Sequence, residues 1–305
     1  MSWGAVGQGG PPSGVFAAMA TPLDGEGRLD HPALNRLLQH ILSHPVQGLC
    51  PAGTTGEGPL LSRQFRARLT AAVVDLVPTG TPVIPAAVAT TISAVQEDLR
   101  AYADAGASAV LVGVPYYYLL GDAAIFRWYE VLAEDAKVPL LLYNIPSKTK
   151  LTISPTVIEK LATHEQIAGM KDSSKDLEYF QRVREVTSSA RFSLFSGSDT
   201  LLIASAYLGG DGLIGAAVNL VPELVTQLWS AALDGRRDLS RDLQRRLVEI
   251  VEACRRVGSP VGWKTALSLM GVCAPHPAFP LEPASLAASN RLAGELRELG
   301  VVRSK

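Results

Sequence analysis

The 305-residue sequence has little cysteine, little net charge and no long apolar run. Its three cysteines, Cys50, Cys254 and Cys273, are too few and too scattered for a disulfide framework or a cysteine metal site, which suits a reducing cytosol. A formal net charge of -1 produces no field that would gather nucleic acid or an anionic membrane. Gly, Pro or a charge interrupts each apolar run before the ~20 residues that span a bilayer. We therefore expect a soluble, cytoplasmic protein that acts on small molecules.

The composition is that of a globular protein with a sizeable core, since 47% of the residues are hydrophobic and 19% are charged. The first residues, MSWGAVGQGGPPS, are rich in Gly, Pro and Ser. They lack the basic start and the unbroken apolar core of a signal peptide. We predict a flexible tail over residues 1–13.

From Gly14 onward a short apolar run is followed by turn residues and a longer amphipathic stretch, and this unit occurs eight times. Several of the apolar runs do not alternate with polar residues, which indicates strands covered on both faces in a parallel sheet. The strand candidates are residues 15–23, 48–53, 82–88, 109–115, 139–146, 167–171, 192–197 and 212–219. Eight β-then-α units favour an α/β fold of the (β/α)8 TIM-barrel type, although an open doubly wound sheet gives the same alternation.

The strand candidates stop at about Arg236, and three helical patterns follow, over residues 237–257, 262–271 and 283–300. We therefore predict a barrel over residues 14–235 and a C-terminal helical extension over residues 236–305. In such a barrel the chemistry lies at the C-terminal ends of the strands, so polar residues at these ends carry more weight than polar residues elsewhere.

Lys171 ends the apolar run Ile167–Met170 and is followed by Asp172. Burial at a barrel mouth lowers the pKa of a lysine amine, and the neutral amine attacks a ketone or aldehyde to give a Schiff base. The ordinary alternative is a solvated strand end or an ion pair with Asp172, and position alone leaves the two interpretations about even.

Tyr143 stands near the end of the preceding strand candidate, where a phenol can pass protons to and from a carbinolamine. Alone it is equally well an aromatic residue that fills the barrel. The second strand candidate runs into Gly53–Gly58, where two glycines and two threonine hydroxyls offer a cradle for a carboxylate or a phosphate. The alternative is a tight turn with Glu57 exposed. Neither a dinucleotide fingerprint nor a P-loop is present there.

Other chemistries have weaker support. His40 and His44 are spaced by four residues, but they fall on the first helix candidate, away from the strand ends, so we predict no metal site. The sequence has no G-x-S-x-G elbow and no pair of carboxylates at adjacent strand ends. A nicotinamide dehydrogenase would need a glycine fingerprint after the first strand, where the residues are Thr21–Asp24.

Together the motifs resemble those of the dihydrodipicolinate synthase/N-acetylneuraminate lyase family of pyruvate-dependent Schiff-base aldolases. The matching segments are GTTGE (53–57), PYY (115–117), YNIPSKT (143–149), GMKD (169–172), FSGSD (195–199) and GLIGAAVN (212–219). They occur in the order and spacing typical of the family, and the resemblance runs from about Gly14 to the C-terminus. Each motif is weak alone, but the combination is specific.

The resemblance implies that Lys171 is the Schiff-base lysine and Tyr143 the proton-transferring tyrosine. It also implies a hydroxyl relay of Thr54 and Tyr117, with Tyr117 supplied across a subunit interface of a homotetramer built as a dimer of dimers. No cofactor is implied beyond the covalent Schiff base. The residues implied to bind substrate are Thr55 and Gly53 at the keto-acid carboxylate, Gly197 and Ile214 beside the keto acid, and Lys148 at the second reactant.

Three departures from the synthase pattern bear on the substrate. Lys148 stands at the position where the pattern of the dihydrodipicolinate synthases has an arginine. That arginine clamps a second carboxylate, and a lysine cannot replace its planar, bidentate contact. Asp172 stands where the synthase usually has glutamate, and Gly258–Pro260 replaces an Asn-Pro element.

The resemblance therefore implies a lyase acting on pyruvate or another 2-keto acid together with an aldehyde, and we favour cleavage or condensation of the 2-keto-3-deoxy sugar acid or 4-hydroxy-2-oxoglutarate type. The alternative is 4-hydroxy-tetrahydrodipicolinate synthase, which condenses pyruvate with aspartate semialdehyde. A further alternative is an inactive relative that binds keto acids.

Overall fold

The computed structural model describes residues 12–302. Eight parallel strands form one sheet in which neighbours follow the chain order and the first strand pairs with the last. The strands are β1 (Gly14–Ala18), β2 (Gly48–Cys50), β3 (Ala86–Ala87), β4 (Val110–Gly113), β5 (Leu140–Asn144), β6 (Ile167–Asp172), β7 (Ser193–Ser196) and β8 (Gly212–Gly215). A parallel bridge between Leu49 of β2 and Val83, in the segment that leads into β3, nearly closes the cylinder. The predicted (β/α)8 TIM barrel is confirmed.

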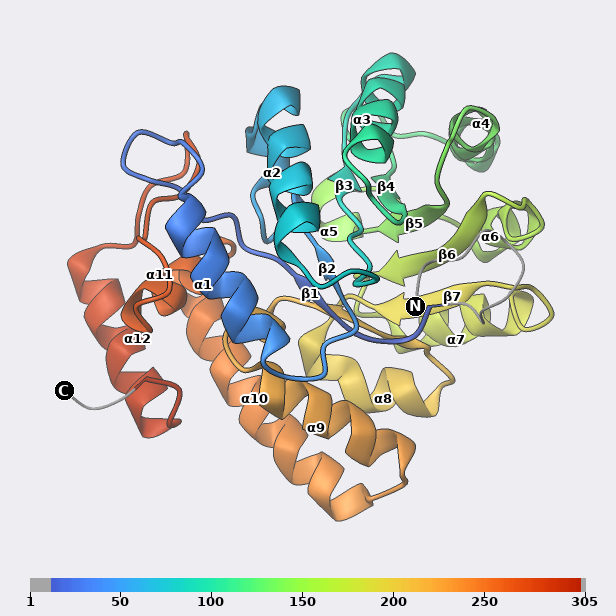
Figure 1. The fold of residues 1–305 in the computed structure, drawn as a ribbon. Coiled ribbons are helices and arrows are strands. Elements are labelled where there is room, and N and C mark those ends of the chain that lie inside the picture. Colours follow the sequence, from blue (N-terminus) through green and yellow to red (C-terminus); the bar gives the residue numbers. More distant parts are fainter. Residues whose placement is uncertain (1–11, 303–305) are drawn as a thin grey trace.

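Helices follow the strands and surround the sheet (Figure 1). The main ones are α1 (His31–Leu42), α2 (Arg63–Leu76), α3 (Ile92–Asp104), α4 (Asp122–Glu134), α6 (Pro155–Leu161), α7 (Leu177–Val186), α8 (Leu202–Tyr207) and α9 (Pro222–Leu233). Several begin behind a side chain whose oxygen accepts a backbone N–H of the first turn, as Asp30 does for α1 and Ser62 for α2. The first residues of these helices can therefore be recognised from the local sequence.

Side chains of each strand alternate between the barrel interior and the surrounding helices. In β5, Leu141 and Tyr143 belong to the interior cluster, whereas Leu140 and Leu142 pack with the helices. Both environments are apolar along most of the strand, which is why these strands show no alternation of apolar and polar residues in the sequence. Polar side chains are tolerated at the strand ends, where the interior opens.

All the strands except β6, which extends one residue further to Asp172, are shorter than predicted, and two of the differences have a clear cause. The predicted strand over 139–146 ends at Asn144, because Pro146 starts the short helix α5 (Pro146–Thr149). Residues 217–219, predicted to extend the last strand, form the 3-10 turn η3. The Asn219 side chain turns back there, donating to the carbonyl of Ala18 and accepting from the N–H of Ala20. Two further short turns, η1 (Gly58–Leu60) and η2 (Asp199–Leu201), follow β2 and β7.

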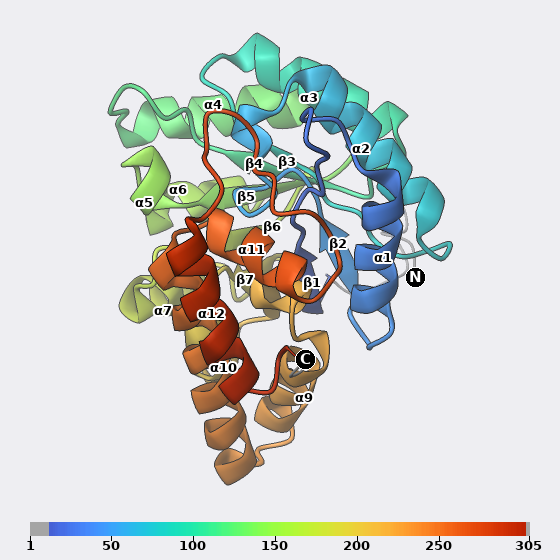
Figure 2. The same ribbon diagram turned by 90° about the vertical axis from the view of Figure 1, so that its left-hand side faces the viewer.

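Three helices follow the barrel: α10 (Arg237–Val257), α11 (Val261–Leu269) and α12 (Leu286–Glu298). Helix α10 packs along α9 and against both α11 and α12 (Figure 1). Figure 2 views the molecule from the side toward which the strands point, with α11 on that side. Among the described helices, none combines the length and the apolar character needed to cross a membrane. Most of the predicted tail, residues 1–11, lies outside the described residues.

Packing between β1 and β8 gives a test of the barrel. A Cβ atom added to Gly212 would lie 2.0 Å from the carbonyl oxygen of Gly14, so we expect Gly212→Ala to lower the free energy of unfolding by about 1–3 kcal/mol. Gly294, within α12, has open space around an added Cβ. As the matched control, Gly294→Ala should stabilise the protein by about 0.5–1 kcal/mol. Chemical denaturation of both variants measures the difference, and equal effects would contradict the close packing of β1 on β8.

Candidate active site

The pairing of β5 with β6 places Tyr143 directly beside Lys171. Both side chains enter the barrel, where Lys171 is only 6% exposed and its Nζ lies 4.8 Å from the centre of the Tyr143 ring. A solvated strand end, the ordinary alternative for this lysine, is therefore excluded. The structure brings together an amine and a phenol in a largely dry space, as expected from their positions at neighbouring strand ends.

Thr54 reaches the same phenol from the other side of the barrel mouth. Its Oγ1 lies 3.0 Å from the Tyr143 hydroxyl oxygen, within hydrogen-bond distance. Thr54 and Thr55 lie in the loop after β2, which closes on itself through a bond from the Gly58 N–H to the Gly53 carbonyl (3.0 Å). A Cβ at Gly58 would lie 1.7 Å from the carbonyl oxygen of Ala52, so glycine is required at that position.

Asp172 does not pair with Lys171, because the next residue along a strand points to the opposite face. Its carboxylate accepts from Asn144 Nδ2 (2.8 Å) and from the hydroxyl and N–H of Ser174 (2.8 and 3.1 Å). Asn144 in turn accepts from the N–H of Ile153 at 3.1 Å. These bonds fix the ends of β5 and β6 to each other. The sequence analysis assigned no role to Asn144, although its position at the strand end, one residue after Tyr143, could have indicated one.

Gly197 lies against the lysine at the end of β7. Its N–H donates to the Asp172 carbonyl (2.6 Å), and a Cβ there would meet Ser173 Oγ at 2.0 Å and Lys171 Cε at 3.0 Å. Ile214, on β8, is fully buried in the interior cluster. Gly197 thus borders Lys171, and Ile214 belongs to the same interior cluster as Tyr143.

Asp199 is a further buried carboxyl group, which sequence reasoning missed although it ends the FSGSD segment. It accepts from the N–H groups of Ala217 (3.1 Å) and Ala216 (3.3 Å), and burial raises its pKa. It therefore fixes the turn after β8 to the turn after β7.

Two predicted residues stand apart from this centre. Tyr117 is 79% exposed, and its ring packs edge-on against Tyr118 at 5.0 Å between ring centres. Lys148 is exposed on α5. In contrast, Glu57 is buried, whereas a simple turn would have left it exposed.

The histidine pair considered from the sequence does not form a metal site among the described residues. His40 Nε2 lies 3.1 Å from the carbonyl oxygen of Leu220, and burial lowers the pKa of this histidine. Over residues 12–302, no group of three His, Cys, Asp or Glu side chains is placed to hold a metal ion.

The fold and the site define a class: a (β/α)8 barrel with a buried lysine, a tyrosine and a threonine hydroxyl converging at the C-terminal ends of its strands. The model of the dihydrodipicolinate synthetase family matches residues 11–299. The chain belongs to this family, and it is an enzyme of the carbon-carbon lyase class with the class I aldolase type of mechanism.

Curated relatives share about a third of the residues. The 4-hydroxy-tetrahydrodipicolinate synthase of Methanothrix thermoacetophila is 32% identical over 272 residues, covering 89% of this chain and 92% of the relative. The synthase of the same name from Methanopyrus kandleri is 34% identical over 292 residues, covering 95% and 97%.

Solved structures agree with this fold. The dihydrodipicolinate synthase of Thermotoga maritima superposes with a TM-score of 0.91 at 28% identity, covering 95% of this chain and 99% of that one. A prophage protein of E. coli K12 from the same family, solved in complex with pyruvate, gives a TM-score of 0.90 at 26% identity and the same coverage.

The environment of Asp172 predicts a pH effect. Burial raises the pKa of Asp172 above its ordinary value of 3.8, so its contribution to stability is full below that value and is lost as the pH rises through the folded-state pKa. Relative to the variant Asp172→Asn, the wild-type protein should become less stable between about pH 4 and about pH 7. Denaturant unfolding at both pH values measures this difference.

Asp24 provides a control for which the pH dependence of stability has the opposite sign. Hydrogen bonds from the backbone and side chain of Arg28 lower the pKa of this exposed carboxyl. The wild-type protein should therefore gain stability relative to Asp24→Asn as the pH rises toward the ordinary carboxyl value of 3.8, and the difference should change little above about pH 5. The same sign for both variants would contradict the burial assigned to Asp172.

Proposed function

We propose that the protein forms a Schiff base between Lys171 and pyruvate and then makes or breaks the adjacent carbon-carbon bond. The observation that carries this proposal is the buried amine beside a phenol that is itself within hydrogen-bond distance of Thr54. Lys171 adds to the ketone carbon, and the carbinolamine loses water to give the imine. Loss of a C3 proton gives an enamine, whose C3 bonds to the aldehyde carbon while the aldehyde oxygen takes up a proton. Hydrolysis of the product imine frees the lysine.

The proposed roles of the neighbouring groups follow from their positions. Tyr143 moves protons at the carbinolamine and at the aldol oxygen, and Thr54 and a Tyr117 from another subunit extend the relay. The loop around Gly53 and Thr55 binds the keto-acid carboxylate through backbone N–H groups and a hydroxyl. Gly197 and Ile214 border the bound keto acid. The protonated imine is the electron sink, so the proposal needs no cofactor.

The exposed residues after β4 support the predicted homotetramer. Tyr117, Tyr118 and Leu119 are 79%, 74% and 79% exposed, and large apolar side chains gathered at one place on a surface indicate an interface. Contact between two copies would cover them and bring Tyr117 to a neighbouring barrel mouth. The tetramer and the cytosolic location stay predictions.

The names of the relatives favour a different aldehyde substrate from the one that the sequence analysis preferred. The curated relatives described above carry the name 4-hydroxy-tetrahydrodipicolinate synthase, so condensation of pyruvate with aspartate semialdehyde becomes the first candidate. Cleavage of a 2-keto-3-deoxy sugar acid or of 4-hydroxy-2-oxoglutarate is the second candidate. It is favoured by Lys148, whose single ammonium group lacks the fork with which arginine binds a second carboxylate.

Trapping tests the Schiff base. Borohydride reduction in the presence of pyruvate should add the reduced keto acid to Lys171, as located by peptide mass mapping, and Lys171→Ala should abolish the adduct. Lys148→Ala is the matched control and should still form it, because Lys148 is exposed and outside the barrel interior. An adduct on another lysine, or none in the wild-type protein, would refute the proposal.

A second experiment compares the aldehydes. If aspartate semialdehyde is the substrate, Lys148→Arg should raise kcat/KM for it by about threefold to tenfold, since a bidentate pair replaces a single contact. Cleavage of 2-keto-3-deoxygluconate should remain slow in both proteins. Fast cleavage of the sugar acid, with poor turnover of the semialdehyde, would select the second candidate.

A further inference from the structure

A buried ion pair joins the loop that carries Thr54 to the C-terminal helices. Glu57 Oε1 lies 2.5 Å from Lys264 Nζ, and the two side chains are 0% and 1% exposed. Neither group takes part in the chemistry proposed above. A charge is almost never fully buried without a specific partner, because loss of hydration opposes the charged form.

The backbone of Glu57 is as constrained as its side chain. Its φ angle of 60° lies in the left-handed region that non-glycine residues rarely adopt, although a glycine stands on either side. The Glu57 N–H donates to the carbonyl of Thr54 at 3.2 Å, which closes the turn on the threonine. The preceding carbonyl, of Gly56, accepts from Thr21 Oγ1 at 2.6 Å. A displacement of Glu57 therefore displaces Thr54.

The C-terminal helices supply every polar partner of this carboxylate that the structure gives. Lys264, on α11, also donates to the carbonyl of His276 at 2.9 Å. The N–H of Ala278, in the segment after α11, donates to the second carboxylate oxygen of Glu57. Burial lowers the pKa of Lys264, and the nearby charge of Glu57 opposes that shift.

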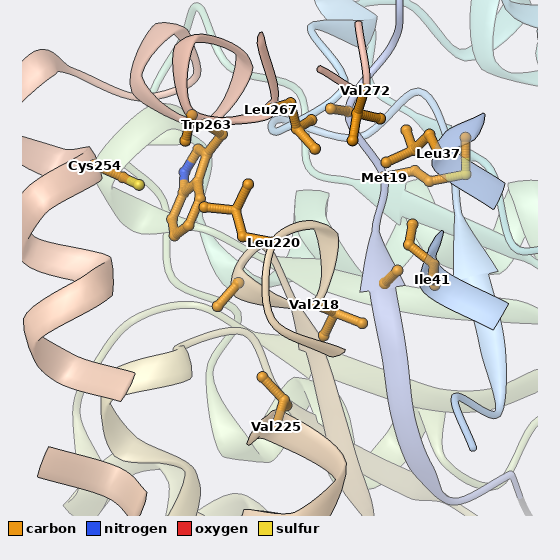
Figure 3. Packing of buried hydrophobic residues seen from close by; sticks show 14 of the residues in the cluster. Met19, Leu37, Ile41, Val218, Leu220, Val225, Cys254, Trp263, Leu267 and Val272 are labelled. Carbon is orange, nitrogen blue, oxygen red and sulfur yellow. The ribbon is translucent and has the colours of Figure 1, made fainter. Parts of the chain in front are cut away.

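Helix α11 is itself held firmly against the barrel. Trp263 and Leu267 lie in one buried cluster with Met19, which follows β1, and Leu37 of α1 (Figure 3). The ion pair thus connects a helix that is packed in the hydrophobic core to the loop that carries Thr54.

We infer that Glu57 and Lys264 are positioning residues through which the C-terminal helices hold the Thr54 hydroxyl at hydrogen-bond distance from Tyr143. This inference rests on the proposed Schiff-base chemistry, in which that contact relays protons. Thr54 Oγ1 and the Tyr143 hydroxyl are 3.0 Å apart, so a small movement of the loop breaks the relay. A displacement of about 1 Å away from the reacting atoms can reduce a rate by about 10²-fold.

The test uses hydrogen-deuterium exchange at the methyl carbon of pyruvate in D2O, which needs the imine and the proton transfer but no aldehyde. We expect Glu57→Gln to slow exchange by about tenfold or more. In the Thr54→Val background the same substitution should change the rate by less than about twofold, because Glu57 acts through Thr54. An additive loss in that background would overturn the inference.

The double variant Glu57→Gln/Lys264→Met distinguishes an effect on the position of Thr54 from an effect on the stability of the protein. It leaves no unpaired buried charge, so its Tm should return toward the wild-type value while exchange stays slow. Exchange that recovers together with Tm would show a structural role only and would overturn the inference. The matched control is Asp211→Asn, which removes the ion pair with Arg184 at the opposite end of the barrel and should lower Tm without slowing exchange.

The two proposals fail in different ways. If the wild-type protein neither exchanges pyruvate protons nor forms the Lys171 adduct, the Schiff-base proposal fails and this inference fails with it. If the wild-type protein does both and Glu57→Gln exchanges at the wild-type rate, only the inference is overturned.

Discussion

The register between β5 and β6 is the constraint on which the site depends. Parallel pairing places Tyr143 opposite Lys171 and Asn144 opposite Asp172. Because successive side chains point to opposite faces, one pair enters the barrel and the other pair leaves it. The inner pair places the lysine amine beside the tyrosine phenol. The outer pair forms the hydrogen bond that holds the two strand ends together. A shift of one residue in either strand would exchange these roles.

The loops after β2, β7 and β8 complete the site, and each of these is fixed by buried contacts. Gly58 permits a backbone approach that no other residue allows, and Asp199 fixes the turn after β8 with two backbone bonds. Glu57 and Lys264 connect the loop after β2 to α11. The C-terminal end of the barrel is therefore a network of buried polar contacts above an apolar interior, and helix α11 forms part of it.

Sequence reasoning reached the fold because each unit of the barrel is marked locally. Apolar runs, caps such as Asp30, and turn residues repeat with the period of the structure, and all eight predicted strands are present. Strand ends were predicted less well, since residues 217–219 are apolar enough for a strand but are turned by the Asn219 side chain. The proximity of Lys171, Tyr143 and Thr54 follows from the sequence because parallel strand ends meet at one edge of the barrel, whereas their catalytic roles stay predictions.

The other contacts at the site join residues that lie far apart in the sequence, so no local pattern predicts them. Glu57 accepts from Ala278, which is 221 positions away, and no local pattern indicates that a charged residue between two glycines is buried. Lys148 illustrates a different limit. Its identity separates it from the synthase pattern, but an exposed flexible side chain does not by itself define which aldehyde it meets.

The most direct measurement of the central claim is the crystal structure of the protein after borohydride reduction with pyruvate. The account predicts continuous density from Lys171 Nζ to the keto-acid carbon inside the barrel, with the Tyr143 hydroxyl in contact with both the adduct and Thr54. Density that shows the lysine side chain unmodified and extended into solvent, or the phenol turned away from it, would contradict the account.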